Sequence, residues 1–219
     1  MMRNHFANAP SQSSIQNLLP GELYCDRHIE CLSTTLGSCV AVCLWDRRLR
    51  VGGMNHFILP SCPPNTENSF RFGDIAVPEL IRRMLQLGGH VRSIQAKLFG
   101  GACVLGSGSS DYAIGQRNIE IAVTELRRYR IPIVASRVLG TDGLVIRQCT
   151  VCGDVWVRQV RSTGNRPLPS AQVHNLPWLT DDIASILAIQ DKNGLPAVIS
   201  TRNKFTGSSA CRHCSNLPY

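Results

Sequence analysis

The chain has 219 residues, enough to bury one good-sized hydrophobic core. Hydrophobic residues make up 43% of it and charged residues 17%, which is ordinary for a globular protein. No apolar run reaches the roughly 18 residues that a membrane-spanning helix needs, and residues 1–17 lack the apolar centre of a secretory signal. We therefore expect a cytoplasmic protein without membrane insertion.

The formal net charge of +8 favours acidic partners in general. No nucleic-acid-binding motif accompanies this charge, and Tyr and Phe are sparse, so we expect no nucleic acid partner. The ten cysteines occur without a secretory signal and are therefore expected to be reduced thiols rather than a disulfide framework.

The N-terminal part of the chain predicts a leader followed by three strands. Residues 1–19 predict a flexible leader, and strands are expected over residues 28–34, 39–45 and 51–59. Within residues 39–45, Cys39 and every second residue after it share one face, and Val, Val and Leu occupy the other. A short polar break between the last two strands predicts a β-hairpin.

Two amphipathic helices and four further strands follow. Apolar residues at helical spacing predict helices over residues 74–87 and 114–128. The strands are expected over residues 93–99 and 131–138 and, as a closing hairpin, over 144–147 and 155–160. This mixture of strands and helices indicates an α/β protein.

The composition changes near Arg161. Residues 162–170 (STGNRPLPS) are typical of a linker, and residues 181–190 predict a short helix. We therefore expect one core domain over residues 20–161 and a C-terminal extension of unknown role over residues 162–219.

One cysteine and one histidine stand out in the predicted hairpin. If it turns about Arg47 and Arg48, paired residue numbers sum to 95, and Cys39 lies opposite His56. Opposite residues have Cβ atoms about 4.5–5.5 Å apart, which lets a sulfur and an imidazole meet. An imidazolium favours the thiolate of a neighbouring cysteine, and the pair is the minimal unit of cysteine nucleophilic catalysis. On spacing alone, a core cysteine beside a core histidine is the alternative.

The backbone before Cys39 suits the same chemistry. Gly37 permits close backbone approach, and the N–H groups of Ser38 and Cys39 are candidates to stabilise an oxyanion.

Longer stretches around both residues resemble one known family. Residues 36–44 (LGSCVAVCL) and 53–60 (GMNHFILP) closely resemble the CheD family of chemoreceptor glutamine deamidases. The similarity continues through residues 71–74 (RFGD), 97–102 (KLFGGA), 114–118 (IGQRN) and 130–135 (RIPIVA). It covers about residues 20–160 and does not extend into the C-terminal extension.

This resemblance implies an enzyme that converts selected glutamine side chains of chemoreceptors to glutamate and releases ammonia. Family members use a Cys–His pair, which Cys39 and His56 match, and a hydroxyl residue just upstream of the cysteine. Ser33 stands at that position and Thr34 is adjacent, so either supplies the hydroxyl, with Ser33 favoured by the family register. No metal or organic cofactor is implied.

The resemblance also implies a fold and a partner. The expected fold is a layered sandwich of mainly antiparallel β-sheet with flanking helices, related to deamidating-toxin-like cysteine hydrolases. The expected partners are the cytoplasmic domains of chemoreceptors and a CheC-type phosphatase. A non-catalytic chemotaxis adaptor that has kept the fold is the alternative.

Two other patterns in the sequence have simpler explanations than a binding site. The glycines of residues 100–108 lack the spacing of a P-loop or a dinucleotide-binding motif, so a loop beside the active site is expected there. The pairs Cys149/Cys152 and Cys211/Cys214 have zinc-ligand spacing. The long gap between them, and the hairpin position of the first pair, favour unrelated thiols over a zinc site.

Overall fold

The computed structural model describes residues 15–103 and 109–160, apart from the side chains of 109–112. Its strands are β1 (Ile15–Asn17), β2 (Leu23–Cys25), β3 (Cys31–Leu36), β4 (Val40–Asp46), β5 (Val51–Asn55), β6 (Ile94–Gly100), β7 (Ile133–Val138), β8 (Gly143–Cys149) and β9 (Val155–Val160). Its helices are α1 (Gly73–Gln86) and α2 (Ser109–Arg128).

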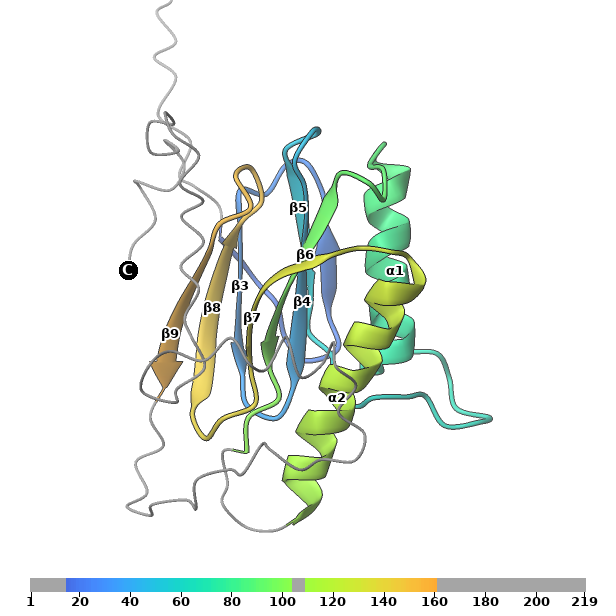
Figure 1. Cartoon of the computed structure of the whole chain (residues 1–219), viewed down its shortest axis with the longest axis vertical. Helices are drawn as coiled ribbons and strands as arrows, with labels where there is room; N and C mark the ends of the chain where they lie inside the picture. Colours follow the sequence, from blue (N-terminus) through green and yellow to red (C-terminus); the bar gives the residue numbers. More distant parts are fainter. Residues whose placement is uncertain (1–14, 104–108, 161–219) are drawn as a thin grey trace, which may run out of the picture.

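These elements form three layers (Figure 1). One sheet has the strand order β1-β3-β8-β9 and packs against a second sheet of order β2-β5-β4-β6-β7. Helices α1 and α2 cover the other face of the second sheet. Only the β1–β3 and β6–β7 pairs are parallel among the described strands. The expected layered α/β sandwich of mainly antiparallel sheet with flanking helices is therefore confirmed.

Strand β4 is buried on both faces because a separate core packs against each. Val40, Val42 and Leu44 belong to the core beneath the helices. Ala41 and Cys43 belong to the core between the two sheets. The alternation predicted for residues 39–45 is confirmed, and it places Cys39 on the side that faces the other sheet.

Both helices bury an apolar stripe against the five-stranded sheet. In α1 the stripe consists of Ala76, Val77, Leu80, Ile81 and Met84. After α1, Gly88 has a φ of 93°, which suits glycine and stops the chain from continuing as a helix. Helix α2 begins at Ser109 rather than at residue 114, because serine and aspartate are favourable in a first helical turn even inside a sequence that reads as a loop.

Two short strands were not predicted. β1 pairs with β3 and β2 pairs with β5, but three residues are too few to show a periodic pattern. β1 lies within the expected leader and Leu18 is buried, so the ordered core begins before residue 20. Residues 1–14, the predicted linker 162–170 and the predicted helix 181–190 lie outside the described residues.

The β4–β5 hairpin has a longer turn than predicted. Asp46 pairs with Val51, so paired residue numbers sum to 97 instead of 95. The carboxylate of Asp46 accepts hydrogen bonds from the backbone N–H groups of Arg48 at 2.8 Å and Leu49 at 3.0 Å. Arg50 adopts a left-handed φ of 56°. The capping side chain of Asp46 and the left-handed backbone of Arg50 together stabilise a four-residue loop.

Asp46 is fully buried and also joins the hairpin to the segment before β6. Its second oxygen accepts hydrogen bonds from the hydroxyl of Ser93 at 2.7 Å and from the backbone N–H of His90 at 3.1 Å. Burial alone would raise the pKa of this carboxyl group, but the hydrogen bonds from Ser93 and from three backbone N–H groups outweigh it and lower the pKa. The charged form is therefore the one that the fold stabilises.

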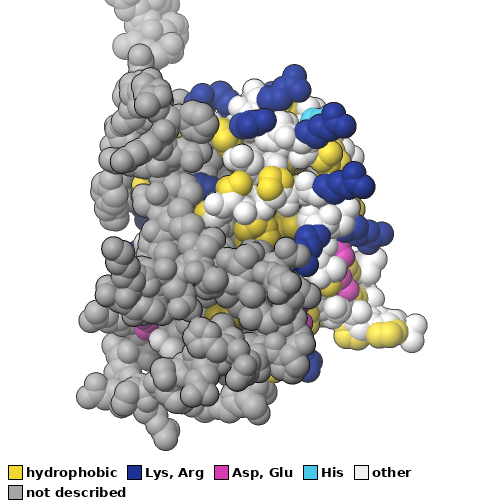
Figure 2. Space-filling view, viewed as in Figure 1, with side chains coloured by type: hydrophobic (Ala, Val, Ile, Leu, Met, Phe, Trp, Pro, Cys, Tyr) yellow, Lys and Arg dark blue, Asp and Glu magenta, His cyan; other side chains and the backbone are white. Residues whose placement is uncertain are grey.

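Neither described helix is long and apolar enough to cross a membrane. On the face seen in Figure 2, the described residues carry many Lys and Arg side chains and few Asp or Glu. This agrees with the positive net charge of the chain.

We predict that Asp46→Ala lowers the free energy of unfolding by about 3 kcal/mol, because four donors lose a charged acceptor in a buried turn. Because the folded-state pKa is lowered, the stabilisation by Asp46 is complete above its unfolded pKa and is lost as pH falls through the folded pKa. Urea unfolding at several pH values measures both effects. The partly exposed Asp142→Ala is the control, and equal losses for the two variants would contradict the assignment.

Candidate active site

His56 directly follows β5 and is almost fully buried, with 2% of its surface exposed. The hydroxyl oxygen of Thr34, on β3, lies 2.8 Å from Nδ1 of His56 and 2.8 Å from the carbonyl oxygen of Leu18. A carbonyl oxygen only accepts, so Thr34 donates its one proton to Leu18. In the hydrogen bond between Thr34 and His56 the imidazole must therefore be the donor, so His56 carries its proton on Nδ1.

This tautomer leaves a lone pair on Nε2 of His56. Nε2 is buried and has no hydrogen-bond partner among the residues that the structure describes. Burial lowers the pKa of His56, and this outweighs the carbonyl of Leu18 and the charge of Glu22, which act in the opposite direction. Near neutral pH the imidazole is therefore uncharged and can accept a proton at Nε2.

Cys39 directly precedes β4, is half-buried, and packs against the core between the sheets. Because Val40 bridges to Phe57, Cys39 is opposite residue 58 and diagonal to His56. The predicted direct pairing of Cys39 with His56 is wrong, because the turn at Asp46 shifts the register by two residues. A shift of two keeps both side chains on one face, with Cβ atoms about 7–8 Å apart at diagonal positions.

The resting state of the pair differs from the sequence-based expectation. Burial raises the pKa of the Cys39 thiol, and a backbone N–H group only partly offsets this. With the pKa of His56 lowered and that of Cys39 raised, the resting pair is a neutral thiol and a neutral imidazole. An imidazolium that stabilises a thiolate is therefore absent from the resting site, and proton transfer must accompany the reaction.

The backbone around Cys39 is fixed by three hydrogen bonds to consecutive carbonyl groups. The Ala102 N–H binds the carbonyl of Gly37 at 2.8 Å, the Asn118 amide that of Ser38 at 3.2 Å, and the Gly101 N–H that of Cys39 at 2.8 Å. In a trans peptide the next N–H group points away from the carbonyl. The N–H groups of Ser38 and Cys39 are therefore held in fixed directions, as an oxyanion site requires.

Asn118, on α2, links the two segments that carry the candidate residues. Its side chain is fully buried and donates to the carbonyl oxygens of Ser38 and Ile58, the latter at 2.7 Å. Ser38 precedes Cys39 and Ile58 follows His56 by two residues, so one amide group holds both segments together. Sequence reasoning assigned Asn118 no role, because nothing in its local pattern indicates a contact 80 residues away.

A glycine at the end of β6 is required by the approach of Cys39. Gly100 has a φ of 106°, and a Cβ atom at this position would overlap the carbonyl oxygen of Cys39. Any other residue would displace the backbone of Cys39. Gly100 thus lies directly against the backbone of Cys39, whereas residues 104–108 of the predicted loop lie outside the described residues.

The structure favours Thr34 over Ser33 as the hydroxyl partner of His56. Successive side chains of a strand point to opposite faces. Thr34 lies on the face that meets the five-stranded sheet and contacts His56. Ser33 is also buried, but the structure places it on the opposite face. The preference for Ser33 from the family register is therefore not supported by the geometry.

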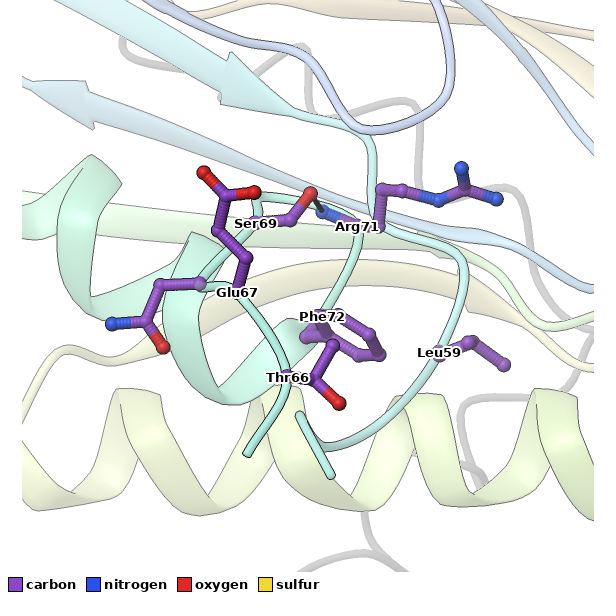
Figure 3. Close-up of a pocket in the computed structure, with 7 residues that line it drawn as sticks. Leu59, Thr66, Glu67, Ser69, Arg71 and Phe72 are labelled. Carbon is purple, nitrogen blue, oxygen red and sulfur yellow. Dashed lines mark hydrogen bonds between the residues drawn. The ribbon is translucent and has the colours of Figure 1, made fainter. Parts of the chain in front are cut away.

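A separate hollow of about 570 Å³ lies beside the loop that follows β5 (Figure 3). Its lining includes Leu59, Glu67, Arg71 and Phe72, and no cysteine or histidine. Cys39 and His56 are not among the residues that line this hollow.

Comparison with known proteins gives consistent matches. Residues 58–159 match the family model described as CheD chemotactic sensory transduction. A protein of Rhodospirillum rubrum is 47% identical over 145 residues, which cover 66% of this chain and 82% of the relative. One of Trichlorobacter lovleyi is 43% identical, over 63% of this chain and 86% of the relative.

A third relative extends the match further along the chain. The protein of Shewanella oneidensis is 34% identical over 184 residues, covering 80% of this chain and 89% of the relative. The first two relatives are named "Probable chemoreceptor glutamine deamidase CheD", and the third carries the same name with the number 1. At this identity and coverage, the chain belongs to the CheD family.

Proposed function

We propose that this chain is a protein-glutamine deamidase that converts selected glutamine side chains of chemoreceptors to glutamate and releases ammonia. The names of its relatives give this activity and substrate. The observation that carries the proposal is the buried Nε2 of His56, which has no hydrogen-bond partner among the described residues and lies on the same face as Cys39. A buried nitrogen without a partner is costly and is typical of a functional group awaiting a substrate.

In the first half of the reaction, the Cys39 thiol transfers its proton to Nε2 of His56 as its sulfur attacks the glutamine carboxamide carbon. The carbonyl oxygen becomes an oxyanion, which the N–H groups of Ser38 and Cys39 stabilise. The imidazolium then protonates the departing nitrogen, which leaves as ammonia. Cys39 and the substrate remain joined as a thioester.

In the second half, water attacks the thioester while His56 takes one of its protons at Nε2. The tetrahedral intermediate then collapses with the Cys39 sulfur as the leaving group. His56 returns its Nε2 proton to that sulfur. The product is a glutamate side chain. The hydroxyl oxygen of Thr34 accepts a hydrogen bond from the Nδ1–H of His56 throughout, which keeps Nε2 directed at the reacting groups.

The proposal includes the cellular setting. The enzyme would act in the cytoplasm on the signalling domains of chemoreceptors, and a CheC-type phosphatase would be a further partner. We also propose that the fold is related to the deamidating-toxin-like cysteine hydrolases, because a sandwich with its cysteine at a strand end suits that class. A non-catalytic adaptor of the same fold would have no use for the unpaired Nε2.

The decisive experiment incubates the protein with purified receptor signalling domains. Peptide mass spectrometry then detects the conversion of an amide to an acid at individual glutamines. We expect Cys39→Ala to abolish both this conversion and ammonia release while leaving the unfolding midpoint near that of the wild type. Cys62→Ala, at a half-buried cysteine in a loop, is the control and should keep full activity. Normal conversion by Cys39→Ala would refute the assignment of the nucleophile.

Substitutions in β3 test the positioning residue. Thr34→Val keeps the shape of the side chain and removes the acceptor for Nδ1 of His56, so the imidazole is free to adopt the wrong tautomer. We expect kcat to fall at least about tenfold, a part of the roughly 10²–10⁴-fold that general acid–base catalysis supplies. Thr34→Ser restores the hydroxyl and should recover most of the rate. Ser33→Ala is the matched control at the neighbouring position. A larger loss of kcat in Ser33→Ala than in Thr34→Val would overturn the assignment of Thr34 as the positioning residue.

The pH dependence follows from the two pKa shifts. The reaction requires a neutral His56, and its lowered pKa means that activity persists below the ordinary imidazole value of about 6.5 and is lost at still lower pH. Because the pKa of Cys39 is raised, its alkylation by iodoacetamide should accelerate only at alkaline pH. Peptide-level mass spectrometry measures that rate at each pH. Rapid alkylation of Cys39 at pH 6 would show a preformed thiolate and contradict the neutral resting pair.

A further inference from the structure

Asn55, the last residue of β5, interrupts the pairing between β4 and β5. Regular pairs flank the interruption on both sides: Cys43 with Met54, and Val40 with Phe57. Between them, Val42 stands opposite Asn55 and Ala41 stands opposite His56, but neither of these two forms a ladder pair. The ladder is therefore open at the position of the candidate general base and closed again directly after it.

The side chain of Asn55 takes the place of its backbone in this gap. The backbones of Val40 and Phe57 exchange two hydrogen bonds of 3.0 Å, so regular alternation makes Val42 and Asn55 the next hydrogen-bonded pair. The N–H of Val42 instead donates to the side-chain oxygen Oδ1 of Asn55 at 2.9 Å. An N–H group only donates, so the amide oxygen must face Val42 and the amide nitrogen must face away. A side-chain oxygen can reach further from the strand than the backbone carbonyl, which accounts for the open ladder.

Stability does not explain the presence of Asn55. Its side chain is fully buried, and its amide nitrogen has no hydrogen-bond partner in the part of the chain that the structure describes. A buried donor without an acceptor is destabilising. An apolar residue would remove this donor and leave the N–H of Val42 able to bond the backbone carbonyl of residue 55. A buried polar group of this kind therefore requires another explanation.

The explanation lies in the neighbouring residue, His56, whose backbone is held only from the side away from β4. Its N–H donates to the carbonyl of Glu22 at 2.9 Å, and its own carbonyl accepts from the N–H of Gly21 at 2.7 Å. On the other side, the open ladder and the small side chain of Ala41 leave room for the imidazole. The imidazole lies between the sheets, where Nδ1 meets the hydroxyl of Thr34 at 2.8 Å.

We propose that Asn55 is a positioning residue for His56 in the deamidation reaction. By holding the N–H of Val42 on its side chain, Asn55 keeps the ladder open and thereby sets where the imidazole lies. In a closed ladder β5 would move toward β4, while Thr34, on the other sheet, would stay in place. The contact between Thr34 and Nδ1 would then be lost, and a misplacement of about 1 Å can lower a rate about 10²-fold. The kinetic consequence rests on the proposed function, whereas the placement of the imidazole does not.

The first test replaces Asn55 by leucine, which is similar in size and has no polar atom. Asn55→Leu should resist urea at least as well as the wild type, because the unsatisfied amide is gone and the ladder can close. With receptor signalling domains as substrate, its kcat should fall at least about tenfold while KM changes little, the signature of an interaction that acts in the chemical step. An unchanged kcat in folded Asn55→Leu would overturn the proposal.

A second variant separates the acceptor from the rest of the side chain. Asn55→Asp keeps an oxygen for the N–H of Val42 but buries a carboxyl group, so it should be less stable than Asn55→Leu. Because its ladder stays open, it should nevertheless be the more active of the two. Activity and stability would then rank the two variants in opposite orders. A higher kcat for Asn55→Leu than for Asn55→Asp would contradict the positioning role.

A spectroscopic measurement on His56 needs no substrate and therefore distinguishes failure of this inference from failure of the proposed function. Long-range ¹H–¹⁵N spectra of the full chain should show the imidazole proton of the wild type on Nδ1. In Asn55→Leu the spectra should show a mixture of the Nδ1 and Nε2 tautomers, because Thr34 no longer holds the ring. This change, seen in a chain that deamidates nothing, would uphold the placement of His56 by Asn55. An unchanged spectrum would overturn that placement even in an active enzyme.

Gln148, on β8, offers a matched control. It is also a buried amide that bonds β4: its Nε2 donates to the carbonyl of Leu44 at 2.8 Å, and its Oε1 has no partner within the described ranges. Leu44 is five residues along the chain from Cys39, a distance of about 16 Å. Gln148→Met should therefore shift the urea midpoint while leaving kcat and the His56 spectrum as in the wild type. Equal losses of kcat in Gln148→Met and Asn55→Leu would indicate a general effect of buried amides and overturn the proposal.

Discussion

The packing of both faces of β4 is the constraint on which the rest of the structure depends. Val42 and Leu44 are fixed by the core beneath the helices, while Ala41 and Cys43 are fixed by the core between the sheets. A slip of one residue would exchange these two sets and place Cys39 under the helices. Because both cores are apolar and closely packed, the strand has no alternative register. Hydrophobic packing therefore sets the face on which the candidate nucleophile lies, and the hydrogen bonds to Gly37, Ser38 and Cys39 then fix its backbone.

The local elements were largely predictable from the sequence, and the long-range geometry was not. The apolar patterns of residues 39–45 and 74–87 predicted the strand and the helix nearly to their ends, because the strand alternates between two buried faces and the helix buries one apolar stripe. The turn after β4 was misjudged because its length depends on how the carboxylate of Asp46 binds the loop. The error leaves Cys39 and His56 on one face, since a register shift of two residues preserves the shared face.

The choice between Ser33 and Thr34 shows the same limit more sharply. The alternation of side chains along a strand places Ser33 and Thr34 on opposite faces, but it does not determine which face meets His56. That depends on how β3 docks on the other sheet, which no local pattern contains. The role of Asn118 likewise depends on where α2 crosses the strands. In both cases a contact between distant segments decides the function of a residue whose neighbours in sequence are uninformative.

The three residues of the proposed active site do not belong to one sheet. Cys39 and His56 come from the sheet that carries the helices, whereas Thr34 belongs to the other. A partly folded chain, in which both sheets had formed without docking, would keep its thiol and its imidazole near each other and lose control of the tautomer. The proposed catalytic arrangement is therefore complete only in a chain whose two sheets have docked. An enzyme that alters glutamines in other proteins gains from this, because a newly made or damaged chain is inert until it is fully native.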